Sequence, residues 1–215
     1  MNQELDAYLR TLLPGREKGF TEMEYTALQN HIPIMDPVSM QFVSQLIQVH
    51  RPENILEIGT AIGYSALRMA DAYPNTKVTT IEKEESRFLQ AKENIKIFEK
   101  QEQIDLVYGD ALEILPKLPP ESFQMVFIDA AKGQYKYFFE LSHPLLKKNG
   151  IILSDNVLFR GYVTDPDSIK HPRHKQIVKK LRAYNQFIAE HPNYHTSIAP
   201  IGDGIAISIK AEGSS

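Results

Sequence analysis

The stretch Leu56-Glu57-Ile58-Gly59-Thr60-Ala61-Ile62-Gly63-Tyr64-Ser65 decides the fold class of this 215-residue chain. It joins a short apolar run to a helix-like segment through two glycines, which let the backbone turn tightly and approach a ligand closely. Because position 61 is Ala and position 64 is Tyr, the stretch departs from the dinucleotide fingerprint G-x-G-x-x-G. The pattern favours a nucleoside-bearing ligand without a pyrophosphate. A strand–helix turn that binds no ligand is the alternative.

Strands and helices are expected to alternate on both sides of this stretch. Short apolar runs predict strands at 54–58, 77–81, 104–108, 124–128 and 150–154. Helices are predicted at 64–73, 84–99 and 134–146, and a last helix at 174–190 precedes two strands, 195–199 and 204–209. With Gly202-Asp203-Gly204 between them, those two strands are expected either to pair as an antiparallel hairpin or to close the edge of the sheet. This order predicts an α/β fold with a mainly parallel sheet covered by helices on both faces.

The first fifty residues are expected to form helices. Leucines recur at helical spacing from Leu5 to Leu13, and Thr21 with Glu24 has the spacing of a capping box at the start of a second helix, 21–30. Asp36-Pro37 predicts an N-cap and first turn for a third. We therefore expect a single domain over 1–215, with an N-terminal helical cap over 1–50 and an α/β core over 51–211.

Composition excludes several classes of protein. The chain has no cysteine, so disulfides, thiolate nucleophiles and zinc–thiolate sites are ruled out. No apolar run reaches the roughly 18 to 20 residues that span a bilayer, and the acidic start MNQELDAYLR is unlike a signal peptide. A cytoplasmic protein without membrane association is the expectation.

Two acidic residues follow predicted strands, where ligands collect in open α/β sheets. Glu82 ends the second strand and is placed to accept hydrogen bonds from both ribose hydroxyls of a nucleoside. Asp110 follows the third strand and is placed to bind an adenine edge. A surface carboxylate at Glu82 and a helix N-cap at Asp110 are the structural alternatives.

The fourth and fifth strands end in a second group of polar residues. Asp129 follows one strand and Asp155-Asn156 follows the other, so the three side chains converge if the strands are neighbours. Two carboxylates and an amide form a hard-oxygen set suited to Mg²⁺. Lys132 is a candidate general base or electrostatic partner. Helix caps and a solvated surface lysine are the simpler interpretations.

Taken in order, these residues resemble the cation-dependent class I O-methyltransferases, the family of catechol and caffeoyl-coenzyme A O-methyltransferases. The resemblance spans about 34–209 and implies a Rossmann-like fold with a seven-stranded sheet preceded by N-terminal helices. It implies that S-adenosylmethionine is bound by Met35, Gly59, Ser65, Glu82, Asp110 and Asp129. It further implies that Asp129, Asp155 and Asn156 hold Mg²⁺, that Lys132 is the general base, and that the enzyme is a homodimer.

Within the family, four stretches resemble the bacterial enzymes that methylate 5-hydroxyuridine at the tRNA wobble position: 31–35, 59–65, 129–135 and 155–159. Ala61 stands where catechol enzymes have an aromatic residue, and Ala130-Ala131 replace their bulkier pair before the lysine, which argues against a catechol substrate. Both substrates place two oxygens side by side, as a chelating metal requires.

Charge distribution favours the tRNA substrate. Between Arg160 and Arg182, seven Lys/Arg stand against two Asp, so this segment carries +5 and the remainder −8 of the net −3. A basic surface beside the proposed metal suits a polyanion, and an anticodon loop exposes its bases. Three interpretations stay open: a tRNA methyltransferase, a methyltransferase of small phenolic compounds, and a cofactor- or RNA-binding protein without catalysis. A solvated helix face is the alternative for the charges.

Overall fold

The computed structural model describes residues 3–211. Their contacts divide into two compact units, which join in sequence at Ala111 and Leu112. The helical cap predicted over 1–50 lies in the first unit together with the first three strands. This division does not test whether the two units fold as one domain, so the single domain stays a prediction.

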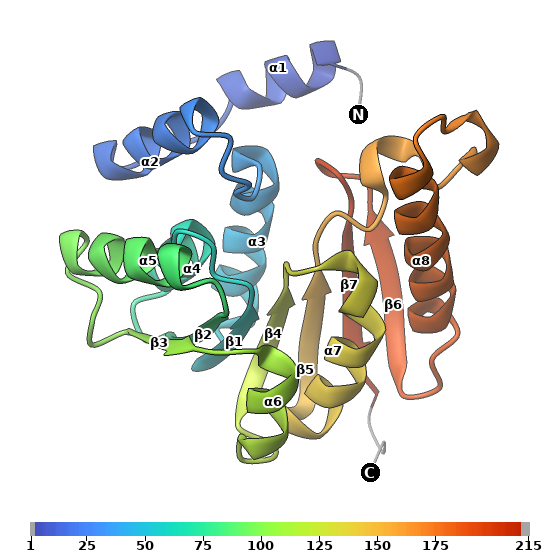
Figure 1. Cartoon of the computed structure of the whole chain (residues 1–215). Helices are drawn as coiled ribbons and strands as arrows, with labels where there is room; N and C mark the ends of the chain where they lie inside the picture. The colour runs from blue at the N-terminus through green and yellow to red at the C-terminus, as the bar shows by residue number, and fades with distance from the viewer. Residues whose placement is uncertain (1–2, 212–215) are drawn as a thin grey trace. The chain divides into compact units, whose positions relative to one another are not determined.

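The first unit is a three-stranded parallel sheet with helices (Figure 1). Its strands are β1 (Asn54–Ile58), β2 (Lys77–Glu82) and β3 (Ile104–Tyr108), in the order β3-β2-β1. Its helices are α1 (Gln3–Thr11), α2 (Lys18–Gln29), α3 (Pro37–His50), α4 (Tyr64–Ala72) and α5 (Glu85–Ile97). Helices α4 and α5 pack against β2 and β3, and α3 packs against α4. All three strands were predicted, each to within one residue.

The second unit contains four strands in the order β4-β5-β7-β6. They are β4 (Phe123–Ile128), β5 (Leu146–Ser154), β6 (Tyr194–Ala199) and β7 (Ile205–Lys210). Parallel pairing joins β4 to β5, whereas β7 runs antiparallel to both β5 and β6, which confirms the predicted hairpin. Helices α7 (Tyr135–Ser142) and α8 (Pro172–Ala189) contact one another and pack on β4 and β6 respectively. Figure 1 shows α8 running beside β6.

Short helical segments complete the described chain. The four-residue α6 (Ala111–Ile114) begins where the two units join. Five single turns of 3₁₀ helix follow: Leu115–Lys117, Lys132–Gln134, His143–Leu145, Phe159–Gly161 and Pro166–Ser168. Within residues 3–211, none of the helices combines the length and apolar character that crossing a bilayer requires.

Buried strands form the core of each unit. Met125, Val126, Phe127 and Ile128 of β4 have no exposed surface, as expected where helices cover a parallel sheet. In β1, Ile55, Leu56 and Ile58 are buried in the same way. Glu57 interrupts this apolar run, and it is equally buried. A carboxylate in such a place needs hydrogen-bond donors around it.

The N-terminal helices confirm one predicted cap and contradict another. Asp36 caps α3 as expected, because its Oδ2 accepts hydrogen bonds from the amides of Val38 (3.0 Å) and Ser39 (3.1 Å). The capping box at Thr21 was wrong. Helix α2 begins at Lys18, so Thr21 lies inside it and its hydroxyl donates to the Lys18 carbonyl at 2.8 Å.

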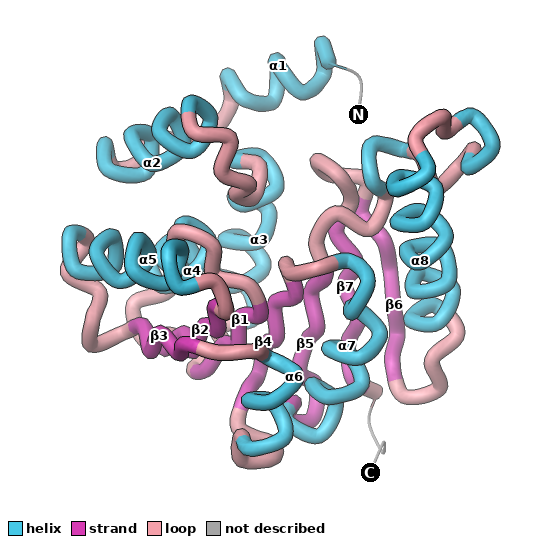
Figure 2. The backbone as a smooth tube through the Cα atoms, viewed as in Figure 1, coloured by secondary structure: helices cyan, strands magenta, loops and turns pink. Residues whose placement is uncertain are grey.

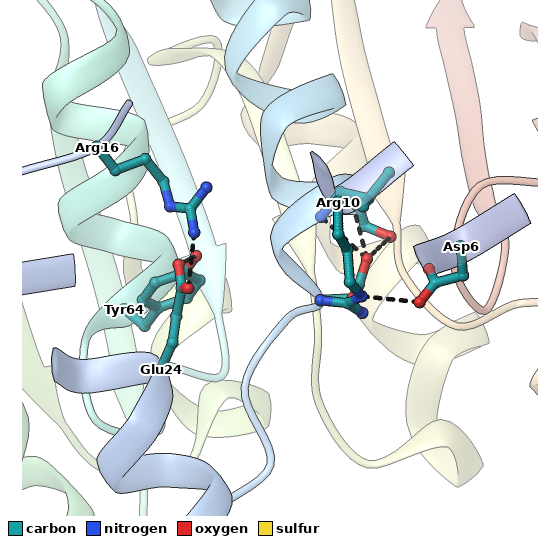
Figure 3. A network of polar contacts seen from close by, with 8 residues as sticks. Asp6, Arg10, Arg16, Glu24 and Tyr64 are labelled. Carbon is teal, nitrogen blue, oxygen red and sulfur yellow. Dashed lines mark hydrogen bonds and ion pairs between the residues drawn. The ribbon is translucent and has the colours of Figure 1, made fainter. Parts of the chain in front are cut away.

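Glu24 is instead part of a polar network that joins α2 to the first residue of α4 (Figure 3). Its carboxylate accepts hydrogen bonds from Arg16 Nη2 at 2.9 Å and from the Tyr64 hydroxyl at 2.6 Å. Nearby, Arg10 of α1 pairs with Asp6 (2.7 Å) and with the capping residue Asp36. Helices α1 and α2 are therefore tied to the segments that flank Met35 and to the first residue of α4.

Candidate active site

The glycine stretch forms a tight turn between β1 and α4. Gly59, Ala61 and Gly63 all have left-handed backbone conformations, with φ of 99°, 48° and 86°. The Gly59 amide donates to the Ile81 carbonyl at 3.1 Å, and the Gly63 amide donates to the Thr60 carbonyl at 2.9 Å. Only glycine adopts such conformations without steric cost. The turn thus keeps backbone close to the carboxyl ends of β1 and β2, as predicted.

Glu82 supports this turn from the end of β2. Its Oε2 accepts a hydrogen bond from the Ala61 amide at 2.8 Å, and its Oε1 accepts from the amides of Lys83 (3.0 Å) and Glu84 (2.9 Å). The side chain is 7% exposed, so it is not the surface carboxylate considered above. Oε2 accepts only one of these hydrogen bonds and so has a further acceptor direction for a ligand hydroxyl.

Ser65 belongs to a buried network that the sequence did not indicate. Its hydroxyl donates to Glu57 Oε1 at 2.5 Å, while the Thr80 hydroxyl donates to Glu57 Oε2. The Thr60 and Thr80 hydroxyls are 2.5 Å apart. Glu57 therefore fixes both the first turn of α4 and the turn after β1. The sequence feature that could have indicated this role is a carboxylate within an otherwise apolar strand.

Met35 and Asp110 also lie in the first unit. Met35 is 3% exposed and directly precedes the α3 cap. Asp110 follows β3 and is partly exposed, and its Oδ2 lies 3.9 Å from Lys83 Nζ. Neither position tests contact with S-adenosylmethionine, so both roles stay predictions. The same holds for Asp129 beside the cofactor, since Asp129 lies in the second unit.

Asp129 and Asp155 come together in the second unit, as predicted. The register pairs Ile128 with Ser154 at the ends of β4 and β5, and the Asp155 amide donates to the Ile128 carbonyl at 3.1 Å. The loops that follow both strands leave the same end of the sheet (Figure 2). Burial, reinforced by the Asp129 charge, raises the pKa of Asp155 well above its ordinary value. Burial also raises the pKa of Asp129, against the effect of Lys132.

Asn156 and Lys132 complete the predicted group. Lys132 Nζ donates to Asn156 Oδ1 at 2.7 Å and lies 6.0 Å from the centre of the Tyr135 ring. The Asn156 side-chain amide donates to Asp155 Oδ2 at 3.2 Å. Tyr135, which the sequence analysis missed, holds the loop by donating its hydroxyl to the Asp155 carbonyl at 3.0 Å. Lys132 is half-buried within this group, so it is not simply a solvated lysine.

The chemistry of these donors fits Mg²⁺ better than a nitrogen- or sulfur-preferring metal. Two carboxylates and an amide oxygen are hard ligands, and two close carboxylates gain stability from a divalent cation. Among residues 3–211, no group of three or more His, Cys, Asp and Glu side chains is arranged to hold a metal. The Asn156 amide is therefore an essential part of the proposed ligand set.

The basic segment lies on the surface of this same unit. Its seven cationic residues are all exposed, and none forms an ion pair within residues 3–211: Arg160, Lys170, Arg173, Lys175, Lys179, Lys180 and Arg182. The opposite face of α8 is buried through Val178, Leu181, Tyr184 and Ile188. Arg182 Nη1 donates to the Val163 carbonyl at 2.5 Å, which ties the preceding loop to the helix.

Comparison with known proteins identifies the class and then the family. A solved structure of a candidate caffeoyl-CoA O-methyltransferase from Staphylococcus aureus superimposes with a TM-score of 0.92 at 38% identity, over 97% of this chain and 100% of that one. The fold is thus the Rossmann-like methyltransferase fold, with seven mostly parallel strands and N-terminal helices. Residues 17–211 match the model of the O-methyltransferase family, so the chain belongs to that family.

Two further similar proteins illustrate the range of the family. A catechol O-methyltransferase from Niastella koreensis is 29% identical over 96% of both chains. The structure of the O-methyltransferase TomG from Streptomyces achromogenes, which functions in tomaymycin synthesis and was solved with S-adenosylmethionine, has a TM-score of 0.83 at 26% identity. It covers 98% of this chain and 99% of that one.

Proposed function

We propose that this O-methyltransferase uses S-adenosylmethionine and Mg²⁺ to convert 5-hydroxyuridine at the tRNA wobble position into 5-methoxyuridine. One observation carries the substrate: an exposed cationic surface, which forms no ion pair with the described residues 3–211, lies in the same unit as Lys132 and the two aspartates. A small phenol does not require such a surface, whereas phosphate contacts supply much of the affinity for RNA.

The first unit would bind the cofactor. The turn at 59–63 would bring backbone close to the ligand, and Glu82 would accept the ribose hydroxyls while its own backbone partners hold it in place. Ser65, oriented by Glu57, would contribute a further polar contact. Binding of S-adenosylmethionine by the homologous TomG supports the choice of cofactor.

The second unit would bind the metal and the acceptor. Asp129, Asp155 and Asn156 would hold Mg²⁺, which, when bound, favours the anionic form of a coordinated hydroxyl. The 5-hydroxyl of the uridine lies beside its O4 carbonyl, so the base offers two adjacent oxygens. Lys132 would accept the hydroxyl proton as a neutral amine, so it would have to lose the ammonium proton first. The acceptor oxygen would then attack the methyl carbon of the sulfonium, so that the C–O bond forms as the C–S bond breaks and S-adenosylhomocysteine leaves.

A small phenolic substrate is the second candidate. The names of relatives favour it, because the Niastella koreensis protein is a catechol O-methyltransferase. The same carboxylates, amide and lysine would serve both substrates. The two candidates differ only in their use of the cationic surface, so charge reversal at Lys179 and Arg182 would impair methylation of tRNA and leave methylation of a catechol unchanged.

The decisive experiment offers 5-hydroxyuridine-containing tRNA and catechol side by side, with labelled S-adenosylmethionine and Mg²⁺. We expect labelled tRNA, and loss of that label when the metal is chelated. Labelling of catechol alone would establish the second candidate. Absence of transfer to either, with the cofactor still bound, would favour a binding protein without catalysis. A tRNA substrate also entails the cytoplasmic location expected from the sequence.

We further propose that the protein is a homodimer through its N-terminal helices. Leu5, Tyr8 and Leu12 of the first helical segment are 48%, 59% and 60% exposed, and Tyr25 and Leu28 of α2 are 66% and 72% exposed. Surfaces of this kind often mark contacts between subunits. Sedimentation equilibrium tests the proposal: replacing Tyr25 and Leu28 with aspartate should convert a dimer into a monomer.

A further inference from the structure

Lys180 differs from the other cations of α8 in what it lies against. A Cβ atom added at Gly133 would come within 3.0 Å of Lys180 Nζ, so the ammonium group lies over the backbone of Gly133. Gly133 directly follows Lys132, the candidate general base. The charge of Lys180 is thereby placed at the loop that carries the chemistry.

The closeness of Gly133 and Lys180 is a matter of space and not of backbone conformation. Gly133 is not among the residues with a positive φ, so its backbone conformation is one that any residue adopts. A Cβ there would lie 3.0 Å from Lys180 Nζ, so the ammonium would have to shift by a few tenths of an ångström. Lys132 itself turns toward Asn156, with 2.7 Å between Nζ and Oδ1. The two lysines therefore serve different groups.

The Lys180 ammonium has neither an ion pair nor a hydrogen bond within residues 3–211. Lys136, on the neighbouring α7, contrasts with it, since Lys136 Nζ lies 3.9 Å from Glu140 and 4.7 Å from the centre of the Phe187 ring. A compact, exposed ammonium without a protein partner is suited to a phosphate, which it binds as a point charge.

We propose that Lys180 binds the phosphate next to the nucleotide whose base is methylated. This inference rests on the proposed RNA substrate and assigns one residue to its positioning. It makes Lys180 selective for a nucleotide within a chain over a free nucleoside, because only the former carries the phosphate. Lys180 is thus a specificity-determining residue, separate from the metal ligands and from the base.

The test compares Lys180→Ala, Lys180→Arg and a matched control, Lys148→Ala. Lys148 is an exposed lysine near the start of β5, at the opposite end of that strand from Asp155. Each variant is assayed for binding of an anticodon stem–loop RNA, for binding of S-adenosylmethionine, and for methylation of 5-hydroxyuridine as free nucleoside and within RNA.

Loss of one phosphate contact should weaken RNA binding by Lys180→Ala on the order of 10-fold, and lower the slope of log affinity against log salt by about 0.7 to 0.9. Methylation of the nucleoside and binding of S-adenosylmethionine should be unchanged. Lys180→Arg should restore most of the RNA affinity, and Lys148→Ala should match the unmodified protein. Equal loss with nucleoside and RNA, weaker cofactor binding, or unchanged RNA binding by Lys180→Ala would overturn the proposal.

A second variant tests the geometry. Gly133→Ala should weaken RNA binding in the unmodified protein by displacing the ammonium, and should have no further effect in the Lys180→Ala background. Equal effects in both backgrounds would contradict the assignment. The proposed function fails separately: RNA binding that depends on Lys180, without methylation of RNA, would leave this contact standing and remove the tRNA reaction.

Discussion

The two units place their carboxylates in opposite circumstances. In the first unit, Glu57 and Glu82 are buried but surrounded by hydroxyl and amide donors of the protein itself. In the second, Asp129 and Asp155 lie close to one another, and burial raises the pKa of both. Their nearest positive charge is Lys132, whose ammonium already donates to Asn156.

This difference indicates different ligands. Carboxylates whose negative charge is stabilised by fixed donors can hold neutral hydroxyl groups in a defined orientation. Carboxylates that destabilise one another gain most from an added cation, which relieves both repulsion and desolvation. The proposed function assigns the nucleoside to the first unit and Mg²⁺ to the second, in agreement with this difference.

Replacing Asp155 with Asn should produce the largest effect, because it removes a proposed metal ligand while conserving volume. We expect methyl transfer to fall by at least about 1,000-fold, since loss of groups that merely support metal ligands already costs roughly 10- to 100-fold. Activity measured against Mg²⁺ concentration, with calorimetric titration of Mg²⁺, checks this. Cofactor affinity should be retained.

A matched control for that variant is Asp167→Asn, which removes an exposed carboxylate from the same unit. Its activity and Mg²⁺ affinity should equal those of the unmodified protein. Unchanged Mg²⁺ affinity in Asp155→Asn would contradict the assignment of Asp155 as a metal ligand. It would also contradict the proposal that the two units bind different ligands.

Glu57→Ala should lower stability more than any exposed substitution. It leaves the hydroxyls of Ser65 and Thr80 buried without their acceptor, at roughly 1 to 3 kcal/mol each. We expect a loss of about 2 to 4 kcal/mol in the free energy of unfolding, measured in urea. Glu93→Ala, on the exposed face of α5, should change it by less than about 0.5 kcal/mol. A loss as small for Glu57 would show that its network contributes little.

Local rules predicted much of the fold and part of the site. Asp36-Pro37 gave the correct start of α3 because the cap involves only neighbouring amides. The capping box at Thr21 failed because the Glu24 carboxylate is bound by Arg16 and by Tyr64, forty residues away in sequence. Strand-end positions sufficed to bring Asp129 and Asp155 together.

The role of Glu57 depended on strand register, which no local pattern contains. Its partner Thr80 lies directly opposite on β2. The position of Lys180 over Gly133 likewise arises from packing of α8 on the loop, whereas the sequence indicated Lys180 only as one of the seven cations of the basic segment. The substrate could not be derived from the ligand set, because any molecule with two adjacent oxygens satisfies it.

Glu82→Gln should weaken cofactor binding and spare the chemistry. Its charge-assisted hydrogen bonds become neutral ones, so the Kd for S-adenosylmethionine should rise about 10-fold, with kcat at saturating cofactor nearly unchanged. Calorimetry and steady-state kinetics separate the two. The neighbouring exposed Glu84→Gln is the control. A fall in kcat without a change in Kd would place Glu82 in the chemical step and contradict its assignment to cofactor binding alone.

The smallest effect concerns the pH dependence of stability, away from both ligand groups. Burial, followed by the charges of Lys210 and His191, lowers the pKa of His143 below its ordinary value of 6.5, and its Nδ1 lies 2.9 Å from the Tyr194 hydroxyl. The unfolded chain therefore binds a proton more readily than the folded one. This contribution to stability is fully present above the ordinary pKa and is lost as pH falls through 6.5 toward the folded value.

His143→Gln, which does not titrate, should flatten the decline of unfolding free energy between about pH 7 and 5. Urea titrations across that range measure it, with His31→Gln, an exposed histidine, as control. If His143→Gln and the unmodified protein lose stability equally as pH falls, protonation of His143 is not coupled to folding. The pH dependence of the unfolding free energy then comes from other titratable groups.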